Sequence, residues 1–101
     1  MSGASNDPVK QRELLGAIAT IYRSEGWLVT DLHCNKTNPV AMSGPDFMML
    51  KGPEAIVVKG LTKGDLSANQ AKMRDAYVAA GLRWVTYYPS EFRRITADAG
   101  G

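Results

Sequence analysis

Cysteine and histidine are nearly absent from this chain, which has one of each, Cys34 and His33, among 101 residues. A single cysteine cannot close an internal disulfide, so we expect a reducing, cytoplasmic setting. One cysteine and one histidine also fall short of the ligand set that a structural zinc site needs. We therefore interpret this pair as an ordinary loop or strand-end segment.

Long apolar runs and strong net charge are missing as well. No hydrophobic stretch approaches the roughly 20 residues that span a bilayer, and residues 1–6 are small and polar, without the apolar core of a signal peptide. Twelve lysines and arginines against ten acidic residues leave a net charge of +2, which permits an anionic partner without requiring one. With 45% hydrophobic and 22% charged residues, the composition is typical of a soluble, intracellular, globular domain with no membrane partner.

Periodicity and turn signals predict seven helical or extended segments. Leu14 and Ile18 recur at helical spacing, and Ser67 with Gln70 forms a capping box at the start of another helix. The expected helices cover 7–25, 67–80 and 89–95, and the expected strands cover 27–32, 46–50, 55–59 and 82–88.

The connections between these segments predict an α/β fold. The tight turn between strands 46–50 and 55–59 favours an antiparallel hairpin, and the helix that follows can cross over so that the last strand lies parallel to the third. The order α-β-β-β-α-β-α then gives a four-stranded mixed sheet flanked by helices. We expect one domain over 7–96, preceded by a flexible leader (1–6) and followed by a loose tail (97–101).

Several short motifs occur in a fixed order along the chain. They are Gly26-Trp27 after the first helix, Gly44-Pro45-Asp46-Phe47, Lys59, Leu66-Ser67-Ala68-Asn69-Gln70, Ala79-Ala80-Gly81 and Pro89-Ser90-Glu91-Phe92. In this order and spacing they resemble the VRR-NUC-type (phage-type) branch of the PD-(D/E)XK nuclease superfamily. The resemblance covers nearly the whole chain after the leader.

This resemblance implies a restriction-endonuclease-like core and a DNA partner, with Mg²⁺ or Mn²⁺ assisting phosphodiester hydrolysis in active relatives. Small phage-type relatives often act on branched or flapped DNA, as Holliday junction resolvases do, and commonly as homodimers, in a bacterial cell or phage-infected host. The resemblance assigns Asp46 as a metal ligand and Lys59 to orienting the attacking water or stabilising the developing charge. It places both on the same side of adjacent strands, with Gln70 either beside them or acting only as a helix cap.

One position departs from the family pattern: Val57 stands where the family has the glutamate of Glu-x-Lys. Alternation along a strand aims residues 57 and 59 the same way, so a second carboxylate is missing, and Asp46 alone is a poor Mg²⁺ site. Asp31, at the end of the first strand, could serve as a substitute ligand, whereas Glu54 lies too far along its strand. The acidic residue that the family has in its first helix corresponds to a position near Gln11.

Two classes of function stay open at this level. The chain is either a structure-specific nuclease with a weakened or rearranged site, or a catalytically inactive module that kept the nuclease fold and binds DNA or a protein partner. Lys36, Lys63 and Lys72 are candidate contacts to DNA phosphates, although scattered cations are as often a solvated surface. Trp84 and Tyr88 could stack on bases, but their alternation with apolar residues also fits a core.

Overall fold

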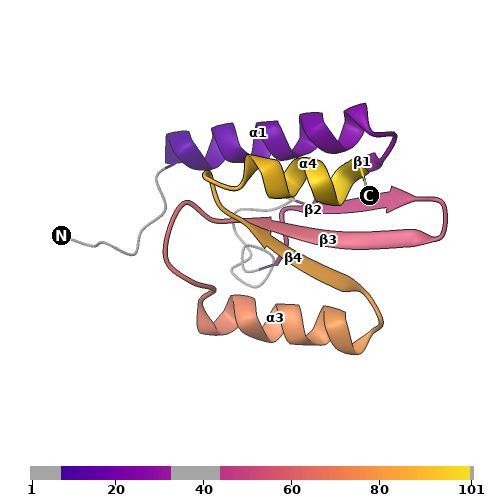
Figure 1. Ribbon diagram of the computed structural model, residues 1–101. Helices are drawn as coiled ribbons and strands as arrows, with labels where there is room; N and C mark the ends of the chain where they lie inside the picture. Colours follow the sequence, from indigo (N-terminus) through magenta and orange to yellow (C-terminus); the bar gives the residue numbers. More distant parts are fainter. Residues whose placement is uncertain (1–7, 33–43, 101) are drawn as a thin grey trace.

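The computed structural model describes residues 8–32 and 44–100. They form an α/β fold in which a four-stranded sheet lies between helices, with α1 and α4 on one face and α3 on the other (Figure 1). The helices are α1 (Pro8–Ser24), α3 (Ala68–Ala79) and α4 (Phe92–Gly100), and the strands are β1 (Leu28–Asp31), β2 (Phe47–Lys51), β3 (Glu54–Gly60) and β4 (Arg83–Tyr87). The predicted fold class and order of elements are confirmed, while the leader 1–6 lies outside the described residues.

The sheet is mixed, with strand order β1-β2-β3-β4. β2 pairs antiparallel with both β1 and β3, and β4 pairs parallel with β3. At the turn between β2 and β3, Gly52 has φ +58°, a left-handed conformation that glycine adopts without strain. The α3 crossover begins at the predicted capping box, in which the Ser67 amide donates to Gln70 Oε1 over 2.8 Å and the Gln70 amide donates to Ser67 Oγ over 3.2 Å.

Most of the hydrophobic core lies between the sheet and the helices α1 and α4. Alternation along β3 sends Ile56 and Val58 to this side, where they meet buried side chains of both helices. The buried cluster contains Leu14, Ile18, Ala19 and Tyr22 from α1, Trp27 after it, Phe47, Met49, Ile56, Val58, Val85 and Tyr87 from the strands, and Ile95 and Ala99 from α4. By contrast, α3 has no buried residue, so it covers its face of the sheet less completely.

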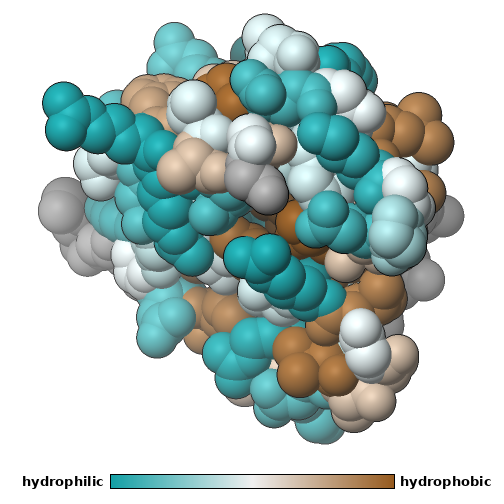
Figure 2. All heavy atoms as spheres, turned by 45° about the vertical axis from the view of Figure 1, so that its right-hand side comes forward, coloured by the Kyte–Doolittle hydropathy of each residue, from teal (hydrophilic) through white to brown (hydrophobic). Residues whose placement is uncertain are grey.

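The uneven covering is visible at the surface. Leu28 and Leu50 are cross-strand partners that remain 63% and 36% exposed, and Val78 on α3 is 53% exposed. Figure 2 shows hydrophobic patches among the hydrophilic side chains in the lower part of the view, at the level of α3 in Figure 1. The α3 side of the molecule therefore presents more apolar surface than a fully covered sheet would.

A chain of buried hydroxyl groups ties α1, β4 and α4 together. The Tyr87 hydroxyl donates to Asp98 Oδ2 over 2.7 Å, and because Tyr87 has a single hydroxyl proton, the Tyr22 hydroxyl must donate to Tyr87 across the 2.6 Å between the two oxygens. Arg94 lies 5.2 Å from the centre of the Tyr87 ring. Burial disfavours the tyrosinate anion and raises the pKa of both tyrosines, and the hydrogen bond that Tyr87 donates to the Asp98 carboxylate raises the pKa of Tyr87 further.

The prediction of a loose tail is wrong for residues 97–100. The α4 helix continues to Gly100, and Ala99 is 1% exposed. Trp27 Nε1 donates to the Ala99 carbonyl over 2.8 Å, and the Trp27 ring packs edge-on against Tyr22 with 5.4 Å between ring centres. The local sequence could not reveal this anchoring, because the residues that hold the end of α4 lie in the first third of the chain.

The tyrosine chain predicts a fall in stability at high pH. The raised pKa of both tyrosines favours their protonated form in the folded protein, whereas tyrosines in an unfolded chain lose their protons near pH 10. Their contribution to stability is therefore complete below about pH 10 and decreases as the pH rises above it. Urea unfolding between pH 8 and pH 11 should show this decline, and Tyr87→Phe should make it shallower. An equally steep decline in Tyr87→Phe would contradict the assignment.

Candidate functional site

Asp46 and Lys59 form a buried ion pair where the start of β2 meets the end of β3. Asp46 Oδ1 lies 3.5 Å from Lys59 Nζ, and the Gly60 amide donates to Asp46 Oδ2 over 2.8 Å. Asp46 is fully buried and Lys59 is 6% exposed, and within 8–32 and 44–100 no other charged side chain is buried. The expectation that Asp46 and Lys59 would be brought together is therefore confirmed.

The backbone on either side fixes the position of the Asp46 carboxylate. Its amide donates to the Val58 carbonyl over 2.8 Å and its carbonyl accepts from the Leu32 amide over 3.0 Å. Asp46 is thus held between the chain that follows β1 and the end of β3. Gly44 and Pro45, which precede it, are buried as well. The turn that sequence analysis singled out therefore places one carboxylate rigidly inside the protein.

Burial sets the electrostatics of this pair. Moving both charges out of water costs several kcal/mol for each ion, and their mutual attraction offsets this only when further hydrogen bonds complete the arrangement. The Gly60 amide supplies one such bond to the carboxylate. At 3.5 Å the contact between Asp46 and Lys59 is longer than a strong charge-assisted hydrogen bond. The Asp46 carboxylate is therefore enclosed and already engaged by the Gly60 amide and the Lys59 amine.

Gln11 brings α1 to the same place. Gln11 Nε2 donates to the Gly60 carbonyl over 2.8 Å, and Gln11 Oε1 is buried without a hydrogen-bond partner among residues 8–32 and 44–100. A Cβ atom on Gly60 would lie 2.9 Å from Leu15 Cδ2 and 3.2 Å from Leu14 Cδ2. Glycine at position 60 leaves room for these two side chains, and a larger residue there would require them to shift. Sequence analysis placed the family's helical acidic position near Gln11, and the contact with Gly60 puts that side chain next to the cluster.

Val57 lies on the strand face that Lys59 occupies, because the two are separated by a single residue in β3. It is fully buried, and its cross-strand partners are Met48 and Trp84. Val58, equally buried, faces the other way into the cluster under α1 and α4. An apolar side chain therefore fills the position at which the family pattern has its second carboxylate.

The register does not favour Asp31 as a substitute ligand. Asp31 is opposite Phe47 in the β1–β2 ladder, and Phe47 belongs to the core under α1 and α4. Alternation therefore directs Asp31 to that side, away from the face shared by Val57 and Lys59. Glu54 pairs with Lys51 at the far end of the hairpin. The register therefore turns Asp31 toward the opposite face of the sheet and places Glu54 at the other end of the hairpin.

The remaining candidates lie elsewhere. The Gln70 side chain takes part in the capping box of α3, which agrees with the simpler of its two predicted roles. Lys63, in the segment after β3, and Lys72, on α3, are exposed. Lys36 lies outside the described residues. The two lysines that can be placed are thus on the surface, separate from the buried pair.

A metal centre does not fit the side chains that the structure describes. Within 8–32 and 44–100, no three histidine, cysteine or acidic side chains converge as ligands. Both oxygens of Asp46 already have protein partners, the Gly60 amide and the Lys59 amine. A Mg²⁺ ion is usually held by one or two carboxylates together with water and phosphate oxygens. With Val57 beside it, this cluster offers one engaged carboxylate.

Comparison with known proteins adds no relative: no family model, curated protein or solved structure matches the chain. Among the described helices, none is both long and apolar enough to cross a membrane.

The buried pair predicts strong coupling between its two members. Asp46→Ala should cost about 3–5 kcal/mol of unfolding free energy, because it leaves the Lys59 charge buried and unpaired. Adding Lys59→Met removes that charge, so the double variant should be more stable than the sum of the two single changes. Urea denaturation of the four proteins gives the coupling energy. The exposed pair Arg74 and Asp75 is the control and should give a coupling close to zero; an equally small value for Asp46 and Lys59 would refute the role assigned to burial.

Proposed function

We propose that this chain is a DNA-binding module with a nuclease-like fold, in which metal-dependent phosphodiester hydrolysis is weakened or lost. The observation that carries the proposal is the buried pair of Asp46 and Lys59 with apolar Val57 on the same strand face. In this proposal Asp46 and Lys59 correspond to two parts of a nuclease constellation. Val57 occupies the place of the third with a side chain that cannot bind a cation.

The enclosed state of the pair supports binding over catalysis. A catalytic carboxylate has to exchange its partners for a metal ion and water during turnover. Here Asp46 is fully buried and bonded to the Gly60 amide. Opening this unit would strip a buried charge of its partners, which is costly. The pair therefore serves to hold β2 and β3 together at the end of the sheet.

The partner that we propose is DNA, branched or structured, bound in the cytoplasm by a monomer or a homodimer. Lys63 follows β3 and so lies at the end of the sheet where Asp46 and Lys59 meet, and Lys72 lies on α3, whose first turn carries no acidic residue. Lysines on such a surface can track phosphates without reading sequence. A small net charge suffices when the cations are placed along one path.

An active, metal-dependent nuclease is the second candidate, and Gln11 is the observation that favours it. Its Oε1 atom is buried and has no hydrogen-bond partner in the described part of the chain, which is unusual for a buried amide oxygen. Amide and carboxylate oxygens are ligands for hard cations. Gln11 would be the ligand that a Mg²⁺ or Mn²⁺ site adds to Asp46, whose carboxylate would first have to release the Gly60 amide or the Lys59 amine.

A rescue experiment tests the origin of the site. Val57→Glu restores a carboxylate two residues before Lys59, and Val58→Glu is its matched control, because both valines are fully buried in β3 but face opposite sides. Without metal, each variant should lose several kcal/mol of stability, since each buries an unpaired charge. Thermal melts with and without Mn²⁺ should show metal-dependent stabilisation of Val57→Glu alone.

Asp46→Ala in the Val57→Glu background should abolish that response. A Val57→Glu protein that ignores Mn²⁺ as completely as Val58→Glu does would show that the cluster is not a former metal site. For the unmodified chain, robust cleavage of branched DNA in Mg²⁺ that Asp46→Ala abolishes would instead establish the nuclease.

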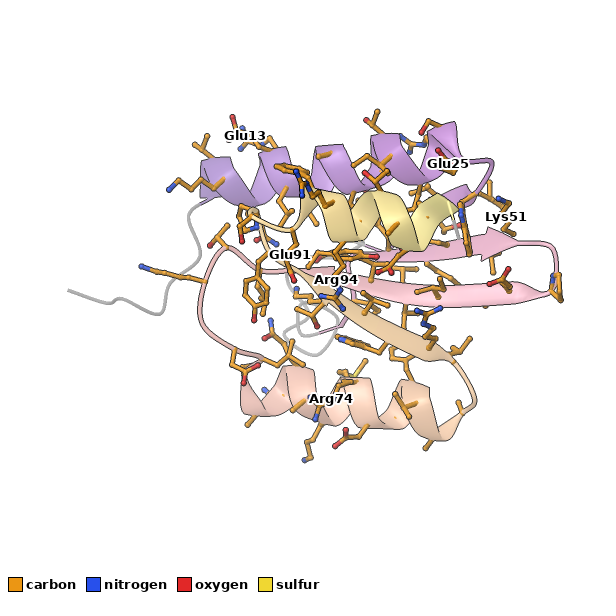
Figure 3. All side chains as sticks on the ribbon, in the orientation of Figure 1. Glu13, Glu25, Lys51, Arg74, Glu91 and Arg94 are labelled. Carbon is orange, nitrogen blue, oxygen red and sulfur yellow. The ribbon has the colours of Figure 1, made fainter. Side chains whose placement is uncertain are left out.

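DNA binding makes a separate prediction about salt. Each phosphate contact that is removed should reduce the slope of log K against log salt concentration by about 1. We expect Lys63→Ala and Lys72→Ala each to have this effect in fluorescence anisotropy. Lys51→Ala is the control. The Lys51 amine donates to the Glu25 carbonyl over 2.8 Å. Figure 3 shows Lys51 and Glu25 together, at the opposite end of the molecule from Glu13. Equal slopes for all three variants would place the DNA on another surface.

A further inference from the structure

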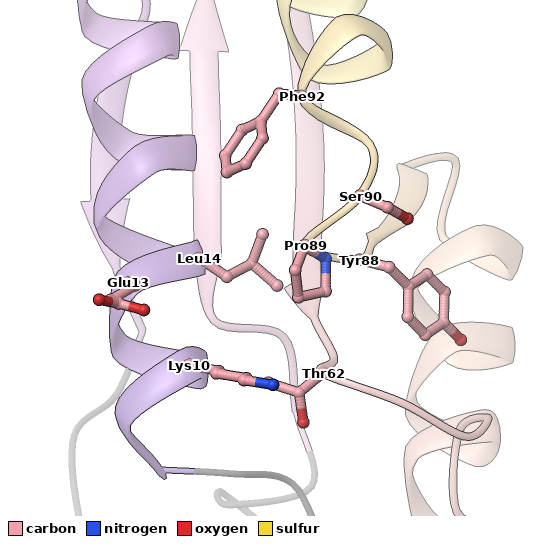
Figure 4. Close-up of a pocket in the computed structure, with 8 residues that line it drawn as sticks. All are labelled: Lys10, Glu13, Leu14, Thr62, Tyr88, Pro89, Ser90 and Phe92. Carbon is pink, nitrogen blue, oxygen red and sulfur yellow. The ribbon is translucent and has the colours of Figure 1, made fainter.

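A pocket lies between the first half of α1, the segment after β3, and the connection from β4 to α4 (Figure 4). Its apolar wall is formed by Leu14, Pro89 and Phe92, and the polar side chains of Lys10, Glu13 and Thr62 line it as well. None of these residues belongs to the buried pair of Asp46 and Lys59. The pocket is therefore a second feature, with a mixed apolar and charged lining.

The pocket adjoins the candidate site through Gly60. Leu14 packs directly against Gly60, because a Cβ atom on Gly60 would lie 3.2 Å from Leu14 Cδ2. Thr62 is two residues after Gly60 in the chain. The amide of Gly60 holds Asp46, and its carbonyl holds Gln11, the residue after Lys10 on α1. The pocket and the buried pair therefore lie near the same end of the sheet.

Phe92 gives the pocket an exposed aromatic surface. Phe92 is the first residue of α4 and is 47% exposed. Its ring extends from α4 toward α1 (Figure 4). Leu14 and Pro89 lie across from this ring. A flat ring entering here would have an aromatic face on one side and aliphatic groups on the other. Stacking of this kind favours nucleobases of any sequence.

Charge on α1 complements the rest of a nucleotide. Lys10 and Glu13 are three residues apart and therefore neighbours on the helix surface. A lysine amine donates to phosphate oxygens, and a glutamate carboxylate accepts from the exocyclic amino group of a base, as it does from cytosine N4. A free phosphate or a simple apolar molecule would use only one of these features.

We infer that this pocket accepts one unpaired nucleobase from a bound DNA strand, with Phe92 stacking on the base, Lys10 contacting its phosphate and Glu13 accepting from its amino group. The inference rests on the proposed DNA-binding function and adds the form of the DNA that is preferred: a duplex that carries an unpaired nucleotide. Fully paired DNA keeps its bases stacked and leaves the pocket unused.

Fluorescence anisotropy on the full chain tests this with three duplexes that differ at one position: fully paired, with a single bulged cytosine, and with an abasic bulge. The cytosine bulge should bind about tenfold more tightly than the abasic one. Phe92→Ala should remove this difference, whereas Phe92→Trp should preserve it. Val78→Ala, which truncates another exposed apolar side chain, should leave the difference intact. Glu13→Gln should reduce the preference for a bulged cytosine over a bulged thymine.

The outcomes separate the two proposals. Equal binding of the cytosine and abasic bulges, or an undiminished difference in Phe92→Ala, would overturn the base pocket while leaving DNA binding in place. Failure to bind any of the three duplexes at low salt would overturn the proposed function, and the base pocket with it.

Discussion

The close approach of α1 to the end of β3 is the constraint on which the arrangement of this end of the molecule depends. Gly60 favours it, because a side chain there would require the ends of Leu14 and Leu15 to shift. The same residue uses its amide to hold Asp46 and its carbonyl to hold Gln11. The backbone of Gly60 therefore contacts α1 and the Asp46 carboxylate at once. It helps to position both the ion pair and the neighbouring pocket.

Burial and charge oppose each other at this point, and the balance explains what the cluster can do. Asp46 and Lys59 tolerate the interior because each neutralises the other. Val57 beside them contributes packing where a further carboxylate would add a second negative charge to a fully enclosed position. A protein that binds DNA through its surface gains from such a rigid interior, whereas a hydrolase needs the same atoms to remain available to water.

Local signals in the sequence were sufficient for the order of the elements. The Ser67 and Gln70 capping box and the glycine turn of the hairpin were predictable because each depends on neighbours in the chain, and the parallel crossover follows from the helix between β3 and β4. The meeting of Asp46 with Lys59 was expected from the resemblance to the nuclease pattern, and the antiparallel pairing of β2 with β3 brings it about. Three features could not be predicted from local signals, because they depend on packing between segments that are distant in sequence. They are the hydrogen bond from Gln11 to Gly60, the face of the sheet to which Asp31 points, and the full length of α4.

The hydrogen bond between Trp27 and Ala99 has a consequence for how the chain folds. These residues are 72 positions apart, and the hydroxyl contact from Tyr22 to Tyr87 spans 65. Contacts of such long sequence separation form late, because the intervening chain must first be ordered. During synthesis, α1 and the hairpin would emerge with the core side of their sheet covered by α1 alone until residues 92–100 are made. The nascent protein would therefore expose the part of its apolar core that α4 later covers, and chaperone binding would protect that part from aggregation.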